Sequence, residues 1–153
     1  MSNVEARLAA AGHTLPPAPK AAAAYIQFTK VGNLVFVAGQ IPTRDGKPVM
    51  TGHVGREVTL PQAQELARLC ALNAIAVLKE ASGGNLDRVR ILKTVNFCNC
   101  APGFTDIHLA ANGASELFAL AFGEKGKHAR SSVGMAELPL DVPFEVEVTA
   151  ALD

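Results

Sequence analysis

The chain has 153 residues, of which 49% are hydrophobic and 18% are charged. These values exclude an intrinsically disordered protein and fit one globular domain over residues 1–153, with residues 1–20 as an N-terminal extension. Fourteen basic residues balance fourteen acidic ones, so the formal net charge is zero. Zero net charge argues against a nucleic-acid binder, which usually carries a basic excess, and favours a protein that associates with itself.

Cysteine content and hydropathy bear on the compartment. Three cysteines are too few for a disulfide framework, and an odd number leaves one unpaired. The first twenty residues lack the basic start and the apolar run of a signal peptide. Because no stretch approaches about 18 uninterrupted apolar residues, we expect no membrane-spanning segment. We therefore expect a cytoplasmic protein in a reducing environment, without a membrane partner.

Local patterns predict the elements in chain order. The turn signal Val31-Gly32-Asn33 predicts a β-hairpin, and Thr59 with Gln62 forms a capping box that starts a helix. Gly123 is a helix stop signal. The expected elements are a helix at 3–11, an extended proline-rich segment at 15–19, strands at 25–29 and 34–38, a loop with room for one short strand at 43–55, a helix at 59–81, a strand at 90–98, a helix at 105–122, and strands at 131–136 and 144–151.

This β-β-α-β-α-β-β order predicts an α+β fold in which two antiparallel hairpins are joined through helices, and both helices lie on a single face of the sheet. The opposite face also needs cover, because four valines in the strands do not all fit under two helices. These valines are Val35, Val37, Val133 and Val146. Association of copies through that face is the simplest solution.

Two separated motifs carry a family resemblance. The run from Gly32 to Pro42, and the run Ala129-Arg130-Ser131-Ser132-Val133 followed by Leu138-Pro139 and Phe144-Glu145-Val146-Glu147, resemble the RidA/YjgF family, also labelled the L-PSP endoribonuclease family. The resemblance implies a chorismate-mutase-like fold with a mixed sheet. It also implies a homotrimeric barrel with ligand clefts between adjacent subunits. Residues 1–20 and the loop at 46–55 lie outside the best match and indicate a divergent branch.

The resemblance also implies an activity, the hydrolysis of enamine and imine products of amino-acid dehydratases to 2-oxo acids and ammonia. The family arginine falls on Arg130, whose planar guanidinium suits a small carboxylate. The glutamate that positions water falls on Glu145, and the tyrosine that closes the cleft falls on Tyr25. Gly39 offers a backbone amide to the carboxylate. Without the resemblance, Arg130 would be interpreted as a surface arginine and Glu145 as part of the polar face of a strand. Tyr25 would be a core aromatic residue, and Gly39 an ordinary strand end.

Three positions depart from the family pattern. The family cysteine two residues after the arginine is Ser132 here, which keeps a hydrogen-bonding group and loses the thiol. The asparagine that contacts ligands in the loop before the second helix falls on Pro102, which has no side-chain donor. The acidic strand position four residues after the arginine is Gly134. We therefore expect an altered pocket even if the carboxylate clamp survives.

Other chemistry is less well supported. Cys98 and Cys100 form a C-x-C pair that fits a metal or redox site, but ordinary buried cysteines are the favoured interpretation. The histidines are scattered without ligand spacing, although His128, two residues before Arg130, lies within reach of a subunit cleft. Gly83-Gly84 follows a helix, so it is a cap and not a phosphate loop. We expect no metal and no organic cofactor.

Three functions remain open at this point. The first is an imine deaminase in which Arg130 anchors the carboxylate. The second is a non-catalytic trimer that binds small carboxylate metabolites in a regulatory role. The third, the endoribonuclease activity of the family name, is disfavoured by zero net charge and by the lack of a basic and aromatic stripe.

Overall fold

The computed structural model describes residues 1–21 and 23–153. Its helices are α1 (Asn3–Ala10), α2 (Leu60–Ala81) and α3 (Ile107–Phe122), and its strands are β1 (Phe28–Val31), β2 (Leu34–Gln40), β3 (Thr43–Arg44), β4 (Lys47–Pro48), β5 (Val89–Asn99), β6 (Ala129–Met135) and β7 (Phe144–Leu152). Single turns of 3-10 helix lie at Leu86–Arg88, Gly123–Gly126 and Pro139–Asp141. In the part of the chain that the structure describes, no helix is both long and apolar enough to cross a bilayer.

The helix ends follow local chemistry. The predicted capping box of α2 is confirmed: the Thr59 amide donates to Gln62 Oε1 at 2.9 Å, and the Gln62 amide donates to Thr59 Oγ1 at 3.3 Å. Ser2 and Glu5 cap α1 in the same way. Gly123 ends α3 with a φ of 61°, in the left-handed region that glycine occupies at little cost. This helix begins at Ile107, two residues later than expected.

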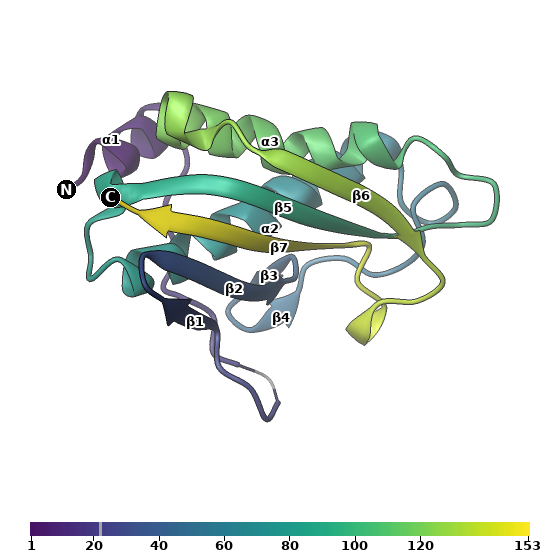
Figure 1. Cartoon of the computed structure of the whole chain (residues 1–153). Helices are drawn as coiled ribbons and strands as arrows, with labels where there is room; N and C mark the ends of the chain where they lie inside the picture. The colour runs from purple at the N-terminus through teal and green to yellow at the C-terminus, as the bar shows by residue number, and fades with distance from the viewer. Residues whose placement is uncertain (22) are drawn as a thin grey trace.

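Five strands of the described chain form one mixed sheet in the order β1-β2-β7-β5-β6, in which only β5 and β6 are parallel (Figure 1). The mixed sheet is confirmed, but a hairpin between the last two strands is wrong. Instead β7 lies between β2 and β5, and β6 occupies the edge. The physical reason is that α3 acts as a crossover, which returns β6 parallel to β5.

The first strands also differ from expectation in their bounds. β1 begins at Phe28, so residues 25–27 precede the predicted hairpin rather than belonging to it. The loop after β2 holds two short strands, β3 and β4, which pair with each other. Residues 15–19 carry neither helix nor strand, as their prolines predict.

Helices α2 and α3 cover one face of the sheet, and the main core lies between the two layers (Figure 1). Apolar and polar residues alternate along β7, and its apolar residues Phe144, Val146 and Val148 are all fully buried. Val35 and Val37 join them under the helices. We expected that two helices could not cover all four valines of the strands. This expectation is wrong for Val35, Val37 and Val146, which the helices do cover.

The opposite face, here called the open face, still carries apolar side chains. Val133 and Phe36 remain 43% and 44% exposed, and Met135 is 37% exposed. The register places Val133 opposite Phe97, which in turn pairs with Glu145, so these side chains share one face. Within this chain, no helix of the described residues covers the open face.

Candidate functional site

Arg130 is the second residue of the edge strand β6, and its side chain points toward α3. Its backbone pairs with Thr94 of β5. The guanidinium is held at two points: Nη1 donates to Ser115 Oγ at 3.1 Å, and Nη2 donates to the carbonyl oxygen of His108 at 2.9 Å. A guanidinium carries five N–H donors. Three donors therefore remain beyond these two bonds, enough for a bidentate grip on a carboxylate.

Ser115 links Arg130 to His128. The Nδ1 atom of His128 lies 2.6 Å from the carbonyl oxygen of Gly126, which only accepts, so Nδ1 carries the proton. The Nε2 atom, 3.0 Å from Ser115 Oγ, then accepts the hydroxyl proton. Burial, together with the charge of Arg130, lowers the pKa of His128 and keeps the ring neutral. The three side chains form one hydrogen-bonded row that ends at the guanidinium.

Ser132 lies two residues further along β6 and faces the same side as Arg130. Its Oγ is buried and has no hydrogen-bond partner among the described residues. The neighbouring Asn96 donates to Thr94 Oγ1 and to the Ser131 carbonyl, while its own Oδ1 is buried without a described partner. Buried polar atoms without partners are uncommon in native proteins. The register places Ser132 and Asn96 two positions along their strands from Arg130 and Thr94, so both unpartnered oxygens belong to residues on the Arg130 side of the sheet.

The structure also bears on one departure from the family pattern. A Cβ added at Gly134 would lie 3.1 Å from Ile107 Cδ1 and 3.3 Å from Cys100 Sγ. Both distances are short for a Cβ, so a larger residue here would require these two side chains to shift by a few tenths of an ångström. Pro102 lies in the exposed turn before α3 and offers no side-chain donor.

Tyr25, Gly39 and Glu145 lie away from the β6 edge, before β1, on β2 and on the central strand β7. Gly39 lies where β2 departs from regular pairing with β7, between Val37 and Gln40. The Glu145 carboxylate occupies the space that a side chain at Gly39 would need, so a Cβ there would overlap it. Burial, with a smaller effect from nearby Glu147, raises the pKa of Glu145. Tyr25 and Gly39 line the same cavity.

The five predicted site residues thus fall into two groups. Arg130 and Ser132 form the first group, on the edge strand β6, and face the helices. Tyr25, Gly39 and Glu145 form the second group: Tyr25 and Gly39 line one cavity, and Glu145 contacts the Gly39 position from the open face. One chain does not bring the two groups together.

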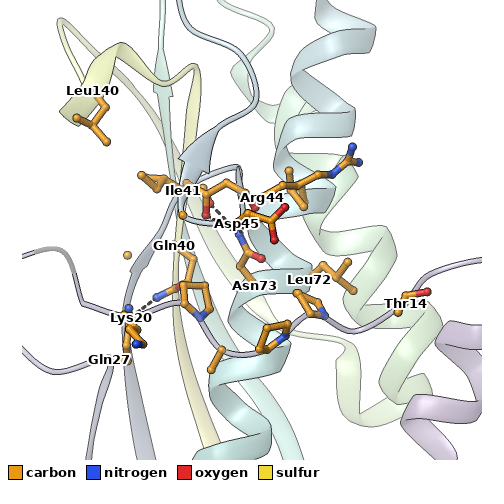
Figure 2. Close-up of a pocket in the computed structure, with 18 of the residues that line it drawn as sticks. Thr14, Lys20, Gln27, Gln40, Ile41, Arg44, Asp45, Leu72, Asn73 and Leu140 are labelled. Carbon is orange, nitrogen blue, oxygen red and sulfur yellow. Dashed lines mark hydrogen bonds between the residues drawn. The ribbon is translucent and has the colours of Figure 1, made fainter.

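Sequence reasoning missed several polar residues of these groups. Ser115 gave no signal, because its partner His128 is thirteen residues away and meets it only after the chain turns through Gly123–Gly126. Gln40 donates to Gln27 Oε1 at 2.7 Å beside the cavity that Tyr25 lines (Figure 2). Glutamine in a strand sequence has no distinctive spacing, so this pair also went unrecognised.

Thiols and metal-binding groups were searched over the residues that the structure describes. Burial raises the pKa of Cys98 and of Cys100, which keeps both thiols protonated and poor ligands. His53, Glu137 and Asp141 bring ligand atoms within 4.8 Å of one another. Both carboxylates are exposed, and His53 Nε2 lies 3.6 Å from Glu137 Oε2, an ordinary surface ion-pair distance. Sequence spacing did not foresee this group.

Comparison with known proteins defines the class. The family model described as "YjgF/chorismate mutase-like, putative endoribonuclease" matches residues 5–152. The chain belongs to this YjgF family, also called RidA, and has its chorismate-mutase-like fold. Protein TCP17 of Trypanosoma cruzi is 40% identical over 152 residues, covering 98% of this chain and 94% of the relative. The 2-iminobutanoate/2-iminopropanoate deaminase of Escherichia coli is 32% identical over 135 residues, covering 87% and 91%.

Solved structures agree with this assignment. The protein Atu1372 of Agrobacterium tumefaciens superposes with a TM-score of 0.93 at 43% identity, over 99% of this chain and 93% of that one. Escherichia coli TdcF, solved with bound serine, superposes with a TM-score of 0.66 at 27% identity, over 89% and 94%.

Proposed function

We propose that this protein is an imine deaminase, which hydrolyses 2-aminoacrylate or 2-iminobutanoate to the 2-oxo acid and ammonia. The observation that carries the proposal is the Arg130 guanidinium, fixed by Ser115 and by the His108 carbonyl with donors to spare. Such a group recognises a small carboxylate through two parallel hydrogen bonds. The deaminase activity in the name of the Escherichia coli relative supports the reaction, and serine bound to TdcF supports a small amino-acid-like ligand.

A residue of the chain can be assigned to each step of the proposed reaction. Arg130 binds the substrate carboxylate, assisted by Ser132 and by the backbone amide of Gly39, and Tyr25 covers the ligand. 2-Aminoacrylate reacts as its imine tautomer. Water adds to the imine carbon while Glu145 takes one of its protons and passes it to nitrogen, which gives a carbinolamine. Glu145 then carries the remaining hydroxyl proton to nitrogen, the C–N bond breaks, ammonia leaves, and the water oxygen becomes the carbonyl oxygen of the 2-oxo acid. The raised pKa of Glu145 suits both proton transfers.

The proposed site needs more than one copy of the chain. Arg130 faces the helices on β6, while Glu145 lies on the open face of β7. Because one chain keeps the two groups apart, we infer a homotrimer in which the cleft between adjacent subunits unites Arg130 of one copy with Glu145 of the next. The exposed apolar side chains of the open face support this assembly.

A non-catalytic binder of small carboxylates is the alternative, because it would use the same Arg130 clamp. In the proposed trimer Glu145 would lie beside the bound carboxylate, an arrangement that binding alone does not require, so the presence of Glu145 favours the enzyme. We further propose a cytoplasmic location, which suits three free thiols. Zero net charge keeps RNA a disfavoured partner.

The test measures ammonia release from freshly generated 2-aminoacrylate and 2-iminobutanoate. Wild type should accelerate release, and Glu145→Gln should lower kcat. Arg130→Lys should raise KM about tenfold or more, since loss of a hydrogen bond to a charged group costs about 1.5–3 kcal/mol. Arg56→Lys, at an exposed site, is the matched control. If ammonia release is no faster than in buffer while the protein still binds pyruvate, the deaminase is excluded and the non-catalytic binder of carboxylates remains.

A further inference from the structure

A cavity of about 640 Å³ lies between the proline-rich segment and helix α2. The segment, here called the strap, comprises residues 14–20. Leu69, Leu72 and Asn73 of α2 form the opposite wall, and Figure 2 shows Leu72 and Asn73 projecting from the helix into the space under the strap. This volume falls in the range of binding sites for small organic molecules.

The strap is fixed at its start by helix α1. Leu8 of α1 is 1% exposed, and the Val4 amide donates to Asp87 Oδ1 at 3.2 Å. Lys79 of α2 donates to Glu5 Oε1 at 2.7 Å. Within the strap, Leu15 and Ala18 pack against the core. The wall of the cavity is therefore part of the fold and does not need a ligand to form.

The strap presents an apolar surface for a chemical reason. Pro16, Pro17 and Pro19 all line the cavity, and a proline has no backbone N–H. The strap therefore lacks three of the seven backbone N–H donors that a segment without proline would have. Facing it, Leu69 and Leu72 add only hydrocarbon. Lys20, Arg44, Asp45 and Asn73 also line the cavity, so the part that suits an aliphatic group is the space between the prolines and the two leucines.

The cavity shares two residues with one half of the proposed site. Tyr25 and Gly39 line the cavity, and Gly39 touches the Glu145 carboxylate on its other side. Gln40 and Gln27 form a polar pair at the same end (Figure 2). Glu145 itself does not line the cavity, so the cavity and the proposed site are linked through Tyr25 and Gly39, which belong to both.

We propose that this cavity receives the aliphatic side chain of the substrate, so that the preferred substrates are 2-imino acids with branched or extended apolar side chains. The proposal rests on the proposed function, which places the substrate against Tyr25 and Gly39. An imine as small as 2-aminoacrylate leaves most of the space unused. Each methylene buried should tighten binding about fourfold.

The first experiment is calorimetric titration of wild-type protein with pyruvate, 2-oxobutanoate, 2-oxopentanoate and 4-methyl-2-oxopentanoate. These stable products share the carboxylate and differ only in the side chain. The dissociation constant should fall about fourfold per added carbon. A constant that stays flat or rises along the series, or no binding of any acid, overturns the proposal.

The second experiment fills the cavity with Leu72→Trp. Binding of 4-methyl-2-oxopentanoate should weaken at least tenfold, while pyruvate binding changes less than about threefold. Leu120→Trp, at a 41% exposed position of α3 outside the cavity, is the matched control. Circular dichroism checks folding, and Ala18→Leu on the strap replaces the first variant if Leu72→Trp does not fold. Equal effects on both acids, or none, contradict the proposal.

The two proposals fail separately. Titration does not need turnover, so graded binding without ammonia release would refute the deaminase and keep the cavity assignment. Ammonia release from small imines, together with a dissociation constant that does not change along the 2-oxo acid series, would support the deaminase and refute the cavity assignment.

Discussion

At the scale of single residues, Arg130 depends on a hydroxyl that both accepts and donates. Ser115 Oγ accepts from the guanidinium at 3.1 Å and donates to the neutral ring of His128 at 3.0 Å. A serine hydroxyl has one proton and two lone pairs, so it satisfies both neighbours at once. A neutral histidine also avoids a second positive charge beside Arg130, which is why the lowered pKa of His128 matters.

Loss of this hydroxyl should loosen the guanidinium. Ser115→Ala leaves Arg130 with one described acceptor, the His108 carbonyl, and leaves His128 Nε2 without its donor. We expect pyruvate to bind about fivefold more weakly, which corresponds to about 1 kcal/mol. Ser115→Thr keeps the hydroxyl and should bind like wild type. Calorimetric titration measures both, and equal binding by the alanine variant would show that Ser115 does not position Arg130.

Residues within a local sequence motif could be predicted, whereas residues that meet only in the folded chain could not. The run around Arg130 and the strand around Glu145 are local in sequence, so the family resemblance reached both. Ser115 was not foreseeable, because a serine in a helix has no spacing relation to a histidine thirteen residues later. The same holds for Gly134, where only the structure shows that Ile107 and Cys100 lie close to the place of an added side chain.

At the scale of elements, α2 and α3 cross at a point where a side chain is excluded. A Cβ at Gly113 would overlap the backbone carbonyl of Gln64. The Gln64 side chain also donates to the Leu109 carbonyl at 3.0 Å, so the two helices are tied beside the crossing. Because α3 supplies Ser115 and the His108 carbonyl, the crossing sets where the Arg130 clamp lies.

Gly113→Ala should therefore destabilise the fold, although alanine favours a helix over glycine by about 1 kcal/mol. Overpacking against backbone costs about 1–3 kcal/mol or more, and a carbonyl cannot rotate away as a flexible side chain can. The midpoint of urea unfolding should fall accordingly. Glu116→Ala, exposed on the same helix, should shift stability by less than about 0.5 kcal/mol. A more stable Gly113→Ala variant would contradict the close crossing.

Element boundaries were largely predictable, whereas strand pairing was not. The capping box at Thr59 and the alternation along Phe144–Leu152 are local signals, and both hold in the structure. The position of β7 between β2 and β5 depends on pairings between strands far apart in the chain. A hairpin of neighbouring strands is the simplest expectation, but the crossover through α3 overrides it.

At the scale of the whole molecule, the open face and the divided site lead to the same assembly. The open face presents apolar residues such as Phe36, Val133 and Met135, each more than a third exposed. It also carries Glu145, half of the proposed catalytic machinery. An assembly that covers this face would bury the apolar residues and, by the same contact, bring Glu145 near a neighbouring subunit.

Val133→Glu tests this coupling. A carboxylate on the open face would be buried between subunits without a partner, which is strongly unfavourable. Wild type should sediment at about three times the 16.0 kDa of one chain, whereas the variant should sediment as a monomer and lose ammonia release. Leu120→Glu introduces the same charge at a similarly exposed position on α3 and should stay trimeric and active. A monomeric wild type, or a monomeric variant with full activity, would show that one chain forms the site alone.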